Sequence, residues 1–296
     1  MPEVAREGRA CLRDYGGDGA PVIVVPSLIN PPFVLDLTPE TSLLRWLARQ
    51  GHHVLLVDWG VPTAGDSCDI GMHVEHLLLP MLHSLSQAPA LVGYCLGGTM
   101  AIGAACLTQV AGLALLAAPW RFGGYGSAER DALARFWSEV RPSCDAMEIV
   151  PMEVLQAAFW NLDPARTVGK FEQFAALDPA SDAARAFVAL EDWANAGAPL
   201  PLEAGRQLFE RFYAADDPGR GRWRIGERTI DPATISAPIV DFVSTGDRIV
   251  PAASSSNAGD RRDITAGHVG MIVGRRARDE LWAPLEHWLS TLPRPK

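Results

Sequence analysis

Short apolar runs that alternate with helical patterns constrain the fold of this chain more than any other feature. The run PVIVVP at residues 21–26 is uninterrupted and rich in β-branched residues, which is typical of a strand buried on both faces. Similar runs follow at 54–59 (VLLVDW), 90–95 (ALVGYC) and 112–120 (GLALLAAPW). Strands that alternate with helices indicate an α/β fold with a mostly parallel, doubly wound sheet.

The helices between these strands have recognisable boundaries. Thr38 as N-cap, Pro39 at the first helical position and Gly51 as a stop predict a helix over residues 39–50. The spacing of apolar residues predicts further helices at 70–86, in spite of Pro80, and at 97–108, with a closing helix in the segment 275–292.

The alternation breaks after Trp120 and resumes at APIVDFVSTGD, residues 237–247. The segment between is mostly helical in pattern and rich in aromatic residues. We therefore expect a core made of residues 1–120 and 237–296, with an inserted helical cap at 121–236. Aromatic residues of this insertion are expected to pack as the cap core or to line an apolar tunnel: Phe159, Trp160, Trp193, Phe209, Phe212 and Tyr213.

Charge and cysteine content exclude several classes of protein. The 296 residues carry a formal charge of −9, which repels phosphate backbones and argues against nucleic acid as the main partner. The N-terminus lacks the apolar stretch of a signal peptide, and no apolar run is long enough to span a bilayer. Five cysteines without close pairing suit a reducing compartment, so a cytoplasmic location is expected.

The hexapeptide GYCLGG, residues 93–98, stands between a predicted strand and a predicted helix. A nucleophile flanked by small residues in this context is the elbow of the α/β-hydrolase fold, where glycines permit a sharp turn and the helix N-terminus faces the nucleophile. Cys95 occupies the place where serine is usual. A structural cysteine in a tight strand–helix contact is the alternative.

A nucleophile at this elbow needs a histidine that takes its proton and an acid that orients the histidine, in the order nucleophile, acid, histidine. Asp247 in GDRIVP and His268 in TAGHVG follow in that order, each just after a predicted strand. The carboxyl ends of parallel strands gather at one edge of the sheet, so we expect the three residues to meet. The other histidines offer no third metal ligand at a suitable spacing, and we predict no metal site.

Donors for an oxyanion are also expected at this edge. In this fold they are the backbone N–H after the nucleophile, here Leu96, and one from the loop after an earlier strand. The loop SLIN provides the second, at Ile29 or its neighbour Leu28.

With these residues in place, the sequence resembles the polyhydroxyalkanoate synthases. The resemblance rests on PSLINPPFVLDLTPE, VLLVDWG, GYCLGGT, FWNLDP, LEDWANAGAPLP, GDRIVP and GHVG, and it spans roughly residues 20–290. In that family a cysteine, an aspartate and a histidine transfer 3-hydroxyacyl groups from coenzyme A into polyester, and the matching positions are Cys95, Asp247 and His268. The resemblance implies coenzyme A thioester as substrate, no bound cofactor, and possible association with polyester granules.

The resemblance leaves several points open. Family members carry a segment ahead of the catalytic domain or recruit a partner subunit, whereas the first core strand here begins by about residue 21, so assembly into a processive polymerase is one open point. A homodimer or a partner subunit is a further expectation from the resemblance. A basic cluster of the insertion, Arg220, Arg222 and Arg224, is a candidate for binding coenzyme A phosphates, with a solvated loop as the alternative. A hydrolase with the same triad, including one like the dienelactone hydrolases, and a non-catalytic synthase-like subunit remain alternatives.

Overall fold

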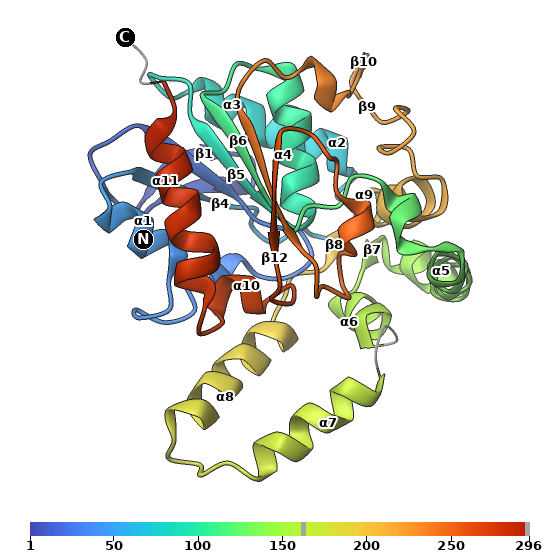
Figure 1. Cartoon of the computed structure of the whole chain (residues 1–296). Coiled ribbons are helices and arrows are strands. Elements are labelled where there is room, and N and C mark those ends of the chain that lie inside the picture. The colour runs from blue at the N-terminus through green and yellow to red at the C-terminus, as the bar shows by residue number, and fades with distance from the viewer. Residues whose placement is uncertain (161–163, 294–296) are drawn as a thin grey trace.

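An eight-stranded sheet forms the centre of the molecule (Figure 1). The computed structural model describes the backbone of residues 1–160 and 164–293, and their side chains except at 159, 160 and 164–168. The strand order is β1-β2-β4-β3-β5-β6-β11-β12. The strands are β1 (Glu3–Glu7), β2 (Ala10–Asp14), β3 (Pro21–Val25), β4 (His53–Asp58), β5 (Ala90–Tyr94), β6 (Gly112–Leu116), β11 (Ile239–Ser244) and β12 (Asp260–Ile264).

Six of these strands run parallel, from β4 to β12, and the hairpin β1–β2 adds to β4 in antiparallel fashion. The predicted α/β class with a mostly parallel sheet is therefore confirmed. Strands β3, β5 and β6 are buried along their whole length, as their continuous apolar runs require.

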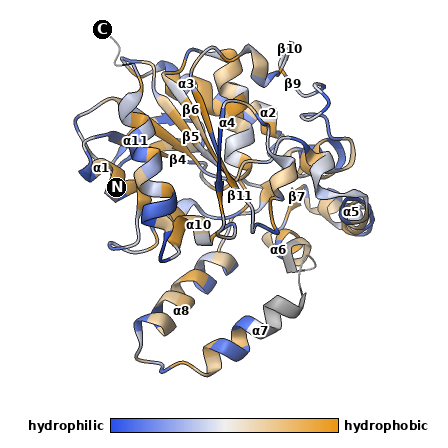
Figure 2. Cartoon of the chain, viewed as in Figure 1, coloured by the Kyte–Doolittle hydropathy of each residue, from blue (hydrophilic) through white to orange (hydrophobic). Residues whose placement is uncertain are grey.

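Helices cover both faces of the sheet and create two apolar cores. One core packs α4 (Leu96–Leu107) and the run α2 (Ile70–Met72), π-helix η2 (His73–Leu78) and α3 (Leu79–His83) against the sheet. The other core contains α1 (Leu43–Arg49), α10 (Gly270–Val273), π-helix η7 (Arg278–Trp282) and α11 (Ala283–Thr291). Figure 2 shows apolar colour along the central strands and hydrophilic colour on exposed parts of α5 and α11.

The start of α1 differs from the prediction. The N-cap is Ser42, whose hydroxyl accepts a hydrogen bond from the Arg45 backbone N–H at 3.0 Å. Thr38 instead closes a preceding turn, because its hydroxyl accepts from the backbone N–H of Thr41 at 3.0 Å. Two hydroxyl residues thus compete for the cap, and the one directly before the apolar run LLRWL starts the helix.

Between β6 and β11 the chain leaves the sheet and forms further helices: η3 (Phe122–Tyr125), α5 (Ser127–Met147), α6 (Met152–Trp160), α7 (Pro164–Ala175), α8 (Asp182–Asn195), α9 (Leu202–Arg206), π-helix η4 (Gln207–Ala214) and η5 (Pro232–Thr234). Two small ribbons accompany them, β7 (Ile149–Val150) with β8 (Leu200–Pro201) and β9 (Arg224–Ile225) with β10 (Arg228–Thr229). Helices α7 and α8 extend as a pair from the body (Figure 1). The 3-10 turns η1 (Pro32–Leu35) and η6 (Ala252–Ser254) complete the elements. The boundaries at 121 and 236 stay a prediction.

None of the helices that the structure describes combines the length and the apolar character that crossing a membrane requires.

Three glycines of GYCLGG allow β5, α4 and the end of β3 to touch. A Cβ on Gly97 would lie 2.1 Å from the Val25 carbonyl oxygen and 2.5 Å from that of Pro26. A Cβ on Gly98 would lie 2.3 Å from the Cβ of Ala118, and one on Gly93 would lie 2.4 Å from the Cα of Gly98. Only residues without a side chain permit these approaches.

This contact predicts a severe effect of Gly97→Ala. The added methyl group meets backbone atoms, which have no free rotation to make room, and we expect a loss of about 3 kcal/mol or more in the free energy of unfolding. The matched control is Gly169→Ala on α7, where no described atom lies within 4 Å of the added Cβ. That change should stabilise by about 0.5–1 kcal/mol. Chemical denaturation measures both, and equal effects would contradict the proposed packing.

Candidate active site

Cys95 occupies a sharp turn between β5 and α4. Its backbone has φ 56° and ψ −132°, a conformation that residues with a side chain rarely adopt. Its N–H donates to the Leu116 carbonyl of β6 at 3.0 Å, and its carbonyl accepts from the Gly98 N–H at 2.8 Å. These bonds hold the strained residue at the carboxyl edge of the sheet, directly before the N-terminus of α4, and strain of this kind clusters at functional sites.

His268 and Asp247 come from the loops after β12 and β11, at the same edge of the sheet. His268 Nδ1 lies 2.6 Å from Asp247 Oδ2. The other oxygen of Asp247 accepts the backbone N–H groups of Ile249 and Val250 at 2.8 and 2.9 Å. Both oxygens of this buried carboxylate thus take part in hydrogen bonds, which fixes the carboxylate and the imidazole ring that it binds.

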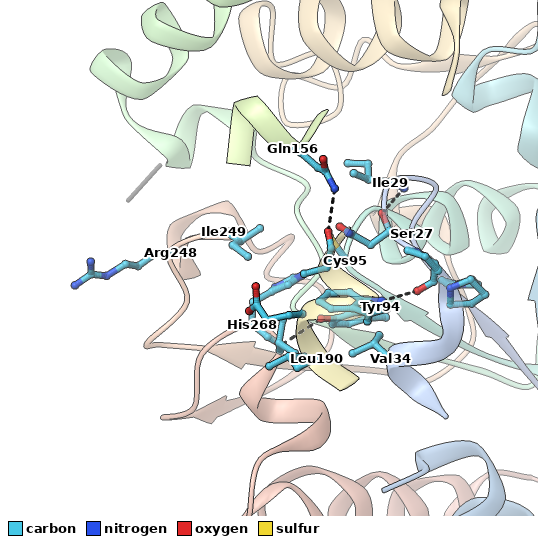
Figure 3. Close-up of a pocket in the computed structure, with 18 of the residues that line it drawn as sticks. Ser27, Ile29, Val34, Tyr94, Cys95, Gln156, Leu190, Arg248, Ile249 and His268 are labelled. Carbon is cyan, nitrogen blue, oxygen red and sulfur yellow. Dashed lines mark hydrogen bonds between the residues drawn. The ribbon is translucent and has the colours of Figure 1, made fainter. Parts of the chain in front are cut away.

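Tyr94 supports the histidine from the other side. The two rings stack with centroids 5.0 Å apart, and the Tyr94 hydroxyl donates to the His268 backbone carbonyl at 3.3 Å. Tyr94 immediately precedes the nucleophile, so one strand end fixes both Cys95 and the face of the imidazole (Figure 3).

The electrostatics favour a charged histidine. Burial lowers the pKa of His268, but the Cys95 thiolate and the Asp247 carboxylate oppose that effect, by charge and by hydrogen bonds, and raise the pKa to about 10. An imidazolium next to Cys95 is the arrangement that activates a cysteine nucleophile, because a positive charge beside the sulfur favours the thiolate.

A cavity of about 280 Å³ opens above the thiol (Figure 3). The core contributes Cys95, Tyr94, His268 and the loop after β3, while the inserted helices contribute Gln156, Lys170, Leu190, Glu191, Trp193 and Ala194. Most of its wall is apolar, and the thiol and the imidazole are among its polar groups. Such a cavity suits an acyl chain that carries a reactive carbonyl.

Two tryptophans hold the loop that follows β3. The Trp59 indole N–H donates to the Pro26 carbonyl at 3.0 Å, and the Trp193 indole N–H of α8 donates to the Pro31 carbonyl at 2.8 Å. One anchor belongs to the core and the other to the insertion. The loop between them forms a wall of the cavity, so α8 helps to fix the position of this wall through Trp193.

The predicted oxyanion donors differ in their surroundings. Leu96 is the first residue of α4, directly after the nucleophile. The Ile29 N–H instead donates to the Ser27 hydroxyl at 3.1 Å. Leu28 lines a second, neighbouring cavity and not the one that contains the thiol. The roles of Leu96 and Ile29 stay predictions.

The aromatic residues of the insertion divide into two groups. Trp193 lines the cavity, whereas Phe209, Phe212 and Tyr213 do not line it and pack with Phe122, Tyr125 and Trp137. The latter group is cap core. The side chains of Phe159 and Trp160 lie outside the described residues.

The three arginines of the basic cluster lie apart from the cavity. Arg222 pairs with the buried Asp217 at 3.0 Å, and Arg224 donates to the Glu227 carbonyl. The basic side chains that do line the cavity are Lys170, which pairs with Glu191 at 2.8 Å, and Arg248. The position of Arg248 directly after Asp247 could have indicated in the sequence that it lies near the site. No motif around Lys170 indicates that it lines the cavity. A role of Arg220, Arg222 and Arg224 in phosphate binding stays a prediction.

A second cysteine–histidine contact has different chemistry. Cys68 Sγ lies 3.3 Å from Nδ1 of His73, which is fully buried. Burial raises the pKa of Cys68 to about 11 and lowers that of His73 to about 4, so both groups are neutral at pH 7. Burial also raises the pKa of Cys11, Cys106 and Cys144. Within the described part of the chain, no cluster of three or more candidate ligands could hold a metal ion.

The chain is similar to known proteins in sequence and in structure. The chain is 27% identical to the poly(3-hydroxyalkanoate) polymerase subunit PhaC of Haloferax mediterranei over 91% of its length, and 28% identical to that of a Synechocystis species, also over 91%. It spans 58% and 77% of these two relatives, and 62% of the one from Haloarcula marismortui, to which it is 26% identical. No family model matches.

Solved structures with a similar fold are α/β-hydrolases. The monoacylglycerol lipase of Paleococcus ferrophilus aligns over 94% of this chain and 97% of its own, with a TM-score of 0.57 and 16% identity. Est816, an enzyme that degrades N-acyl homoserine lactones, aligns over 97% of this chain and 99% of its own, with the same TM-score and identity. These likenesses confirm the predicted fold.

The charged imidazole beside Cys95 predicts how the thiol reacts with iodoacetamide. In His268→Ala the thiolate loses its cationic partner, and a free thiol is only a few per cent ionised at pH 7, so alkylation should slow by at least about tenfold. Asp247→Asn removes the carboxylate charge that helps to raise the pKa of His268. The imidazolium should therefore lose its proton at a lower pH than in the wild type, where the pKa of His268 is about 10. Rates between pH 6 and 10, with the modified peptide identified by mass spectrometry, measure both. Unchanged rates in His268→Ala would show that the pair does not form.

The anchor between α8 and the loop predicts a separate effect. Trp193→Phe keeps an aromatic ring but removes the hydrogen bond to Pro31, so the wall of the cavity loosens while the triad keeps its contacts. We expect esterolysis of p-nitrophenyl butyrate to fall by roughly tenfold, comparable to the loss of about 1–1.5 kcal/mol for one hydrogen bond, with unchanged alkylation of Cys95. Equal activity of variant and wild type would refute the role of this anchor.

Proposed function

We propose that this chain, a relative of the polyhydroxyalkanoate synthases, moves 3-hydroxyacyl groups from coenzyme A through a thioester on Cys95 to a hydroxyl acceptor. One observation carries the proposal. A cysteine stands at the strained elbow in contact with a charged histidine, which is itself held by Asp247, and the mainly apolar cavity above it is closed in part by inserted helices. The similarity to polymerase subunits over nine-tenths of the chain supports the same reaction.

The first half of the reaction loads the enzyme. The Cys95 thiolate attacks the thioester carbonyl, and a new S–C bond forms as the oxygen becomes an oxyanion. When the carbonyl is restored, the bond to the sulfur of coenzyme A breaks and His268 gives its proton to the departing thiolate. His268 Nδ1 is bound to Asp247, so Nε2 is the nitrogen that exchanges this proton. The products are free coenzyme A, an acylated Cys95 and a neutral His268.

The second half reverses the proton flow. Neutral His268 takes the proton of the acceptor hydroxyl, the acceptor oxygen attacks the Cys95 thioester, and a C–O bond forms while the C–S bond breaks. The thiolate and the imidazolium are then restored. Throughout both halves Asp247 stabilises the charged imidazole and keeps its orientation.

The free energy of the thioester on Cys95 explains why a cysteine replaces serine at the elbow. Exchange of one thioester for another changes the free energy little, so the acyl group on Cys95 keeps the activation that a hydroxyl acceptor needs. An oxygen ester on serine would lose that activation. The apolar side chains around the thiol, Val34, Leu190 and Ile249 among them, favour an acceptor that binds in the cavity over bulk water.

Other parts of the activity stay predictions. Coenzyme A thioester is expected as substrate and no bound cofactor is needed. The acceptor is a growing polyester or a small hydroxyl compound. A homodimer or a partner subunit, and a location in the cytoplasm or on polyester granules, are expected from the resemblance.

Substitution of Cys95 tests the proposal. With 3-hydroxybutyryl-coenzyme A, Cys95→Ala should abolish thiol release, and Cys95→Ser should lose most transfer, because serine is deprotonated only with difficulty and its ester is less activated. Cys144→Ala is the matched control, since Cys144 is buried in the insertion, away from the cavity, and should leave turnover unchanged. Released coenzyme A is followed with a thiol reagent, and the acyl product by chromatography.

The nature of the product decides between transfer and hydrolysis. Oligomer or an ester of an added hydroxyl acceptor supports the synthase. Free 3-hydroxy acid alone, even with a primer present, would contradict transfer and indicate a cysteine hydrolase. Turnover that persists in Cys95→Ala would refute the nucleophile itself.

A further inference from the structure

Ser27 lies next to the contact that fixes the elbow. The carbonyls of Val25 and Pro26 touch Gly97 in the first turn of α4, and Trp59 holds the Pro26 carbonyl. Ser27 is the next residue, so its backbone has little freedom to move relative to Cys95. Strands β3 and β5 are direct neighbours, with Val25 paired to Gly93, which brings the start of this loop beside the end of β5.

The Ser27 side chain points to the cavity that contains the thiol. Ser27 lines this cavity together with Cys95 and His268, and it is 7% exposed (Figure 3). Its oxygen accepts the Ile29 N–H at 3.1 Å. A hydroxyl has one proton to donate, and among the described residues Ser27 donates it to no protein acceptor. A buried hydroxyl with an unused donor needs a partner, and the cavity is where that partner can bind.

We propose that the Ser27 hydroxyl donates a hydrogen bond to the oxyanion that forms when Cys95 attacks an acyl carbonyl. The proposal rests on the proposed acyl-enzyme chemistry and adds a catalytic residue to it. Ser27 acts together with the N–H of Leu96 at the start of α4. The Ile29 N–H, expected to contact the oxyanion itself, instead binds the Ser27 oxygen and polarises the hydroxyl, which makes that hydroxyl a stronger donor.

A purely structural role for Ser27 is the competing explanation. A serine whose oxygen accepts the N–H two residues later is a common turn. The chain contains such a turn at Ser256, which accepts the Ala258 N–H at 3.1 Å and is 8% exposed, and which does not line the cavity. Ser256 is thus matched to Ser27 in burial and in turn geometry, and differs in that it does not line the cavity.

Two reactions of Cys95 separate the two roles. Acylation by p-nitrophenyl butyrate forms an oxyanion, whereas alkylation by iodoacetamide displaces iodide and forms none. We compare wild type, Ser27→Ala and Ser256→Ala on the full chain by the burst of p-nitrophenolate and by the rate of alkylation. Loss of one oxyanion donor should slow acylation by about 10²-fold in Ser27→Ala, with alkylation unchanged. Ser256→Ala should match wild type in both reactions.

Each other result overturns the proposal. Acylation of Ser27→Ala at the wild-type rate would show that the hydroxyl does not touch the oxyanion. An equal loss of acylation and alkylation would mean that Ser27 only supports the loop or the triad. In both cases a wild type that still transfers acyl groups keeps the proposed function intact. A wild type without any burst would refute both Ser27 as donor and Cys95 as acyl acceptor.

Discussion

The approach of the Gly97 backbone to the carbonyls of Val25 and Pro26 is the contact on which the site depends. It joins the first turn of α4 to the end of β3 at a distance that no side chain allows. Because Cys95 stands two residues before Gly97, in its strained conformation, the same contact sets the nucleophile against the loop that begins at Pro26. A small shift of this contact would separate the thiol from the donors that the reaction needs.

The core and the insertion contribute different parts of the chemistry. Cys95 directly follows β5, and Asp247 and His268 lie in the loops after β11 and β12, so all three candidate catalytic residues belong to the core. The insertion adds no member to this triad. It contributes Leu190, Trp193 and their neighbours to the wall of the cavity, and through Trp193 it holds the loop after β3. The wall that the insertion adds to the cavity is therefore linked to the position of the loop after β3.

Much of this arrangement could be predicted because its signals are local. Apolar runs identify strands, and parallel strands place Asp247 and His268 at one edge, where the structure has them 2.6 Å apart. Contacts between distant segments have no such signal. The bond from Trp193 to Pro31 joins residues 162 positions apart. The predicted start of α1 was wrong because Thr38 and Ser42 are both residues that favour the N-cap position, and only packing decides between them.

The central claim is that Cys95 carries the acyl group on its way to a hydroxyl. The most direct measurement mixes the chain with 3-hydroxybutyryl-coenzyme A, quenches within one turnover, and maps the added acyl mass to a residue by mass spectrometry. We expect one hydroxyacyl group on Cys95 that disappears when a hydroxyl acceptor is added, with formation of the corresponding ester. An adduct on any other residue, or an acyl group on Cys95 that passes only to water, would contradict it.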